Sequence, residues 1–274
     1  MPRTGSWDDS SAGRDSVSSN RLARAAKLQG MADVADLYEG LRNDISEVVS
    51  RLGPEELETS VPATPGWTIK DVLTHVAADA TCVIAGDFPT EFFEAFGEAA
   101  AVAKVNDWTA QQLKERADSS LEELLQEWKT SGTEVAAMMR GDRPWPEGTL
   151  GFADRILLTD ATVHQQDIFG ALGIERDRES VPIKLGLSGY IATMGWRLGP
   201  AGLPPLEFDV GEKTYTAGEG EPGASVSETR FELFRAMSGR RSPEQIKAYA
   251  WKDDPEPYVP YFYPYGIRAD ALVE

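Results

Sequence analysis

Four long stretches of this chain repeat apolar residues at spacings of three and four, which places those residues on one face of an α-helix. The stretches cover residues 32–52, 68–83, 113–139 and 153–172. Thr68, with Asp71 three residues later, predicts an N-cap for the second stretch. Glycine or proline follows three of the stretches and predicts where those helices end. A shorter helix is expected within residues 88–105, and a further apolar helix within residues 182–198. Long amphipathic helices joined by short connections predict a four-helix bundle.

The composition changes after residue 199. Prolines and glycines at 200–205 indicate a linker, and residues 206–210 alternate like a strand whose hairpin partner is expected at 213–216. Helices are expected at 226–237 and from Ser242, which can act as an N-cap before Pro243. The predicted fold class is therefore mainly α: a bundle of residues 31–199 followed by a small α+β C-terminal domain of residues 200–274.

Residues 1–30 are rich in serine, aspartate, arginine and glycine, and they predict a disordered tail. The helical pattern begins just after Met31, which could be the natural start of the protein. The chain has no N-terminal apolar segment typical of secretion and no apolar run near the roughly 20 residues that a membrane span needs. A cytoplasmic protein is the simplest expectation.

Acidic residues outnumber basic ones by 45 to 27, which gives a net charge of -18 and an isoelectric point near 4.6. Phosphates would be repelled, so neither nucleic acid nor an anionic membrane surface is an expected partner. The single cysteine, Cys82, excludes an internal disulfide and a multi-cysteine metal site. The pattern indicates no particular oligomeric state.

The helix expected at 153–172 carries a polar group on its apolar side. Asp160, His164 and Asp167 fall on the same arc as the apolar residues, and an unpaired buried carboxylate is costly. A divalent cation would offset that cost. The only other histidine, His75, lies on the second helix and could supply a third ligand. Two imidazoles and one carboxylate with open positions form the ligand set of a catalytic divalent site.

Other interpretations of these residues remain open. Asp160 and His164 could share a buried hydrogen bond without metal, and Asp79, four residues after His75, is a rival carboxylate ligand. Asp167 could hold one tautomer of His164, or it could make a local hydrogen bond or salt bridge. Cys82 lies two helical turns from His75, roughly 10 Å away, and is expected to be a small core residue.

Three motifs in order resemble one known family. They are Pro65-Gly66-Trp67-Thr68-Ile69-Lys70-Asp71-Val72-Leu73-Thr74-His75, then the segment from Asp160 to Ile168, then Phe231 to Ser242. The sequence thereby resembles the mycothiol-dependent maleylpyruvate isomerase family, whose N-terminal part is a DinB-like metal-binding bundle. The resemblance covers about residues 31–255.

The resemblance implies a divalent ion, zinc above all, on His75, Asp160 and His164. The isomerase has a glutamate where this chain has Asp160. Arg240 matches the family's C-terminal arginine and would hold a substrate carboxylate, although a cation near a helix end is an alternative role. The implied cosubstrate is mycothiol, a small-molecule thiol of actinobacteria, which the metal would activate for addition to a small electrophilic substrate, in cis–trans isomerisation or S-transfer.

Two other functions fit the same residues. A metal-dependent hydrolase would activate water and would need a general base, for which Asp167 and Asp79 are the nearest candidates. A non-enzymatic binding module would use the metal as a structural element, in a closed site with four ligands.

Overall fold

The computed structural model describes residues 34–90, 92, 95, 97–175 and 177–274. The expected disordered tail, Met31 and parts of the helix expected at 88–105 (residues 91, 93–94 and 96) lie outside the described residues. Among the described residues, no helix is long and apolar enough to cross a membrane.

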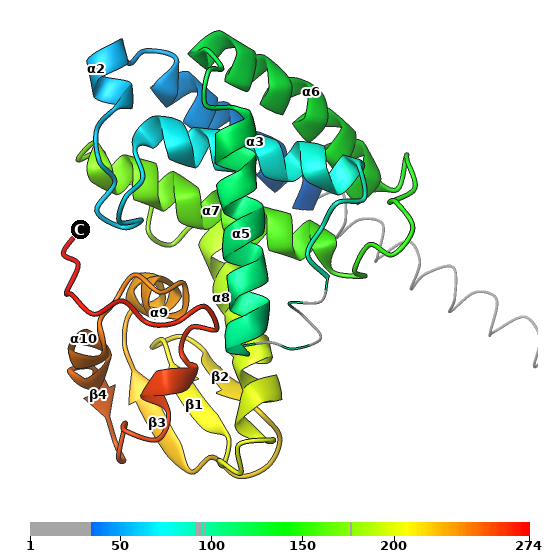
Figure 1. The fold of residues 1–274 in the computed structure, drawn as a ribbon. Helices are drawn as coiled ribbons and strands as arrows, with labels where there is room; N and C mark the ends of the chain where they lie inside the picture. The colour runs from blue at the N-terminus through cyan, green and yellow to red at the C-terminus, as the bar shows by residue number, and fades with distance from the viewer. Residues whose placement is uncertain (1–33, 91, 93–94, 96, 176) are drawn as a thin grey trace, which may run out of the picture.

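The predicted bundle is confirmed and forms the upper part of the molecule (Figure 1). It consists of the helix at residues 34–49, α3 (Ile69–Ile84), α6 (Leu121–Arg140) and α7 (Ala153–Ala171), with the short α2 (Pro54–Leu57) on the first connection. Buried side chains from all four long helices form one apolar cluster. Within it the indole nitrogen of Trp128 donates a hydrogen bond to the Tyr38 hydroxyl at 3.1 Å.

Local signals set where α3 begins. Thr68 accepts a hydrogen bond from the backbone nitrogen of Asp71, and the Asp71 carboxylate accepts one from the backbone nitrogen of Thr68. This reciprocal capping satisfies two backbone groups that the first helical turn leaves unpaired. The expected N-cap is confirmed, and it fixes the register that carries His75 into the bundle.

The helix expected at 113–139 is present as α6, but its predicted start is wrong. The chain instead forms α5 (Ala99–Glu115), then a break, then α6, whose first turn is capped reciprocally by Ser120 and Glu123. The spacing of apolar residues did not reveal α5, because this helix buries few residues, chiefly Ala101 and Gln112, and its apolar periodicity is weak. In Figure 1, α5 crosses the front of the molecule between the bundle and the lower part.

The lower part contains a four-stranded sheet in the order β2-β1-β3-β4. The strands are β1 (Leu206–Asp209), β2 (Thr214–Ala217), β3 (Ala224–Ser227) and β4 (Ala250–Trp251). The expected β1–β2 hairpin is confirmed, β1 pairs with β3 in parallel, and β3 pairs with β4 antiparallel. The helices here are α9 (Arg230–Met237), α10 (Pro243–Lys247) and the 3-10 turn η1 (Val259–Tyr261).

Two predicted helix starts in this part had different outcomes. Ser242 caps α10 as expected, together with Gln245. The helix expected from residue 226 starts later, because Val226 belongs to β3 and pairs with Trp251, and Thr229 caps α9. A short apolar run before a helix cannot be divided by periodicity when the strand partner lies far along the chain.

Helix α8 (Val181–Leu198) lies between the two parts (Figure 1). Its buried side chains, with Val163 of α7, belong to the apolar cluster of the sheet and α9. The domain boundary expected at 199/200 falls just after this helix and stays a prediction. At Gly195 the helix approaches the turn after β2 so closely that an added Cβ would lie 2.4 Å from the backbone nitrogen of Gly218.

We expect Gly195→Ala to destabilise the protein by about 1–3 kcal/mol, because backbone on both sides must separate to admit the methyl group. The matched control is Gly189→Ala on the same helix, where an added Cβ meets nothing within 4 Å. That change should be neutral or stabilising by up to about 1 kcal/mol, as alanine favours helix over glycine. Urea unfolding measures both; equal stabilities of the two variants would contradict the close approach.

Candidate metal centre

The structure brings His75, Asp160 and His164 together from α3 and α7. One donor atom from each lies within 4.8 Å of the others. The Nε2 atom of His75 is 3.6 Å from one oxygen of Asp160, and the Nε2 atom of His164 is 3.6 Å from the other. These separations exceed a hydrogen bond. They are close to the roughly 3.4 Å that separates two ligands of one tetrahedral zinc ion with bonds of 2.0–2.1 Å.

The other nitrogen of each imidazole faces a group of the protein. Nδ1 of His75 lies 2.9 Å from the amide oxygen of Gln112, and Nδ1 of His164 lies 3.0 Å from a carboxylate oxygen of Asp167. The Gln112 oxygen is hydrogen-bonded to His75, whereas the Asp167 carboxylate lies at ion-pair distance from His164 without the geometry of a full hydrogen bond. Both groups are acceptors, so they favour a proton on Nδ1 and leave the Nε2 lone pair directed toward Asp160. This is the arrangement that a metal-binding histidine needs, and the residues fit a divalent cation.

The centre carries an excess of negative charge. Burial opposes protonation of His75, yet the Asp79 and Asp160 carboxylates outweigh it and raise the pKa of His75 to about 10. Burial disfavours the anion of Asp160 too, but His164 and His75 lower its pKa. A centre that draws an additional proton onto an imidazole also attracts a metal cation.

Access to the centre is limited. The residues His75 and His164 are 7% and 6% exposed, whereas the Asp160 side chain is 31% exposed. Trp67 covers the two rings: it stacks on His164 at 6.1 Å between centroids and meets the edge of His75 at 5.3 Å. A ligand therefore reaches the donors past the Asp160 side chain.

Asp79 and Cys82 lie outside this cluster of donors. Asp79 accepts a hydrogen bond from Gln112 Nε2 at 2.8 Å and lies 3.4 Å from Nδ1 of His75, the nitrogen that points away from Asp160. The Cys82 thiol is a weak partner of the same amide at 3.7 Å, and burial raises its pKa to about 11. Cys82 is therefore a neutral thiol, whereas Asp79 helps to orient Gln112.

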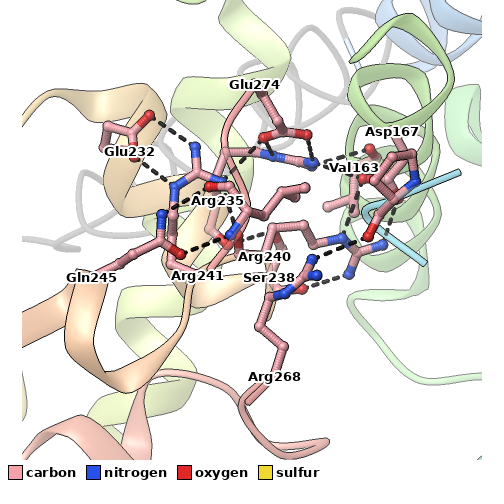
Figure 2. Close-up of polar contacts among 12 residues, drawn as sticks. Val163, Asp167, Glu232, Arg235, Ser238, Arg240, Arg241, Gln245, Arg268 and Glu274 are labelled. Atoms are coloured by element: carbon pink, nitrogen blue, oxygen red, sulfur yellow. Dashed lines mark hydrogen bonds and ion pairs between the residues drawn. The ribbon is translucent and has the colours of Figure 1, made fainter. Parts of the chain in front are cut away.

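The structure places Arg240 against Asp167 (Figure 2). Arg240 donates from Nε to Oδ1 at 3.2 Å and from Nη2 to Oδ2 at 2.5 Å, and it also donates to the backbone oxygen of Ser238. Its neighbour in this contact is Arg235, which donates to Oδ1 of Asp167 at 2.8 Å. Arg240 is thus held at the carboxylate that lies beside the second histidine of the centre.

Three further residues shape the centre and were not predicted. Gln112 lies on a helix that was not recognised, Trp67 appeared only as a member of the first motif, and Arg235 carries no spacing signal. A glutamine or tryptophan has no pattern of its own that points to a metal. Only the packing of α5 and of the loop before α3 reveals their roles.

The fold and the donors define a DinB-like helical bundle with a candidate divalent-metal site. Residues 38–169 match the family model of the mycothiol maleylpyruvate isomerase N-terminal domain. The match covers 132 of the 274 residues, so the N-terminal bundle is similar to the N-terminal domain of that family.

Two solved structures share the fold. The crystal structure of a mycothiol-dependent maleylpyruvate isomerase superposes with a TM-score of 0.53 at 15% identity, and the match covers 82% of this chain and 95% of that one. A histidine-to-alanine mutant of such an isomerase gives the same TM-score and coverage at 14% identity. Among curated proteins, none matches the sequence significantly.

We expect Asp160→Asn to weaken zinc binding by more than about a hundredfold, because losing a ligand costs more than the roughly 10- to 100-fold of an outer hydrogen-bond partner. Asp79→Asn is the matched control on the other side of His75 and should cost no more than about tenfold. Chelator competition with the purified proteins measures both. A larger loss in the Asp79 variant would make Asp79 the carboxylate ligand.

Proposed function

We propose that this protein is a divalent-metal-dependent enzyme that uses mycothiol, or a closely similar thiol, for addition to a small electrophilic substrate. The products would arise by cis–trans isomerisation or by S-transfer. The observation that carries the proposal is the convergence of His75, Asp160 and His164, with both Nε2 atoms facing one carboxylate. The match of residues 38–169 to the family model and the fold shared with a mycothiol-dependent maleylpyruvate isomerase support the choice of thiol chemistry.

The residues that would hold the ion are His75, Asp160 and His164. When bound, a divalent ion would lower the pKa of a thiol placed against it, so that the thiolate is available at neutral pH. The chain's own part is to orient both imidazoles through Gln112 and Asp167 and to keep water away with the indole of Trp67. The thiol has to come from a small molecule, since the pKa of Cys82 keeps it neutral.

Arg240 is the proposed contact for a substrate carboxylate. A guanidinium has five N–H donors, and the hydrogen bonds to Asp167 and Ser238 use one on each of its three nitrogens. The Tyr263 hydroxyl also lies against this guanidinium, so an anionic substrate group would bind the donors that the hydroxyl leaves available. Because Asp167 fixes the guanidinium plane, little conformational freedom would be lost on binding.

The hydrolase alternative has less support. Both candidate bases are engaged: Asp79 accepts from Gln112, and Asp167 is held by Arg235 and Arg240. Arg240 and Arg235 hold the pKa of Asp167 well below its usual range against the effect of burial, so it is a poor proton acceptor. A purely structural metal site is also less favoured, because the cluster of described residues supplies three ligands and a closed site needs four.

We expect turnover of maleylpyruvate or a generic electrophile only when metal and mycothiol are both present. Product formation would be followed by chromatography with the metal-replete protein, with and without the thiol. His164→Ala should abolish turnover, because it removes a ligand, whereas Cys82→Ala should retain it.

The controls separate the three functions. Thiol-independent turnover would support the hydrolase and contradict the proposal. Absence of turnover with every thiol, together with a large loss of thermal stability on chelation, would indicate a structural metal.

A further inference from the structure

Asp167 forms the ion pairs that connect the bundle to the lower part of the molecule. Its side chain has no exposed surface, and it lies on α7, three residues after His164. Figure 2 shows the guanidinium groups of Arg235 and Arg240 approaching this carboxylate from the other part of the chain. Arg235 comes from α9, and Arg240 from the turn that follows it.

Arg235 contacts α7 on both sides of His164. Nη2 donates to Asp167 at 2.8 Å, and Nη1 donates to the backbone oxygen of Val163 at 3.5 Å. The Arg235 side chain is itself fully buried. A fully buried guanidinium that binds the residue before a metal-site histidine and the carboxylate behind its ring restricts how that ring can rotate.

The C-terminal segment also holds Arg235, in addition to its contacts with α7. Its Nε donates to Glu274 at 2.8 Å, and Glu274 also accepts from Arg241 at 3.1 Å. Gln245 of α10 holds this segment, since its amide donates to the backbone oxygen of Leu272 and accepts from the backbone nitrogen of Leu272. The position of Arg235 is thus set by the C-terminal segment, not by α7 alone.

The charges of this network balance. Arg235, Arg240 and Arg241 face the carboxylates of Asp167, Glu274 and Glu232, so three cations meet three anions. Asp167 can therefore remain an anion next to His164 without an uncompensated buried charge. An anionic acceptor at Nδ1 keeps the Nε2 lone pair available on the side of Asp160.

We propose that Arg235 is a positioning residue of the metal centre. It acts through Asp167 to fix the ring orientation and the tautomer of His164, so that the affinity for the metal depends on contacts made by the C-terminal part of the chain. The inference rests on the proposed metal site at His75, Asp160 and His164.

The test compares Arg235→Lys with Arg241→Lys. Both variants keep the net charge, so long-range electrostatics are unchanged, and both lose a planar fork at a buried arginine of the same network. Arg241 is a matched control because, among the described residues, it donates to Glu232, Glu274 and the Arg240 backbone oxygen and not to Asp167. Zinc affinity is measured by chelator competition, and the cobalt(II)-loaded proteins give a visible spectrum that reports the ligand geometry.

We expect Arg235→Lys to weaken zinc binding about tenfold, the lower end for loss of an outer partner, and to change the cobalt spectrum. Arg241→Lys, which is connected to Asp167 only through Glu274 and Arg235, should change both readouts clearly less than Arg235→Lys, even where it lowers thermal stability to a similar extent. Equal effects of the two variants, or no effect of Arg235→Lys, would overturn the positioning role. A wild-type protein that binds neither zinc nor cobalt would instead remove the metal site and this inference with it.

A second measurement is made on the wild-type protein, and a variant is needed only to assign its signals. The chain has two histidines, so ring nitrogen signals in long-range ¹H–¹⁵N spectra can be assigned with a single His75 substitution. In the metal-free wild-type protein we expect the neutral His164 ring to carry its proton on Nδ1. A proton on Nε2 would show that Asp167 does not set the tautomer and would overturn the proposal.

Discussion

The carboxylate of Asp167 has no exposed surface, and the organisation of the centre depends on how that charge is compensated. Burying an isolated anion costs several kcal/mol or more, so the fold must supply cations or hydrogen-bond donors. Arg235 and Arg240 supply the cations, and the imidazole of His164 lies against the remaining side. The same contact therefore joins the two parts of the molecule and holds one histidine of the candidate metal centre.

Apolar packing and ion pairs both connect the bundle to the lower part, and they differ in how strongly they depend on orientation. Helix α8 packs its apolar side chains with the sheet and approaches the turn after β2 closely at Gly195. Apolar contact of this kind is strong but weakly directional. The arginine–carboxylate network is directional, because a planar guanidinium binds a carboxylate in few orientations. Packing brings the parts together, and the charged network sets the orientation of α7 relative to α9.

The sequence predicted much of the fold because several signals were local. The reciprocal cap of Thr68 and Asp71 and the N-cap of Ser242 involve residues within one helical turn, and both occur as expected. The prediction failed at residues 113–120 and 226–229. There, weak periodicity on α5 and the distant partner of β3 hid the true boundaries. The error at β3 concerns a partner far along the chain, whereas the error before α6 overlooked the local capping pair of Ser120 and Glu123.

The sequence by itself determined which side chains could bind a metal: it holds two histidines, and helical spacing places Asp160 and His164 on one face. Only the tertiary structure decided that His75 meets that pair, that both Nε2 atoms face Asp160, and that Gln112 and Arg235 complete the surroundings. The physical reason is how far apart in the sequence the interacting residues lie. Spacing along a helix is fixed by backbone geometry, whereas contacts between α3, α5, α7 and α9 depend on how whole elements pack.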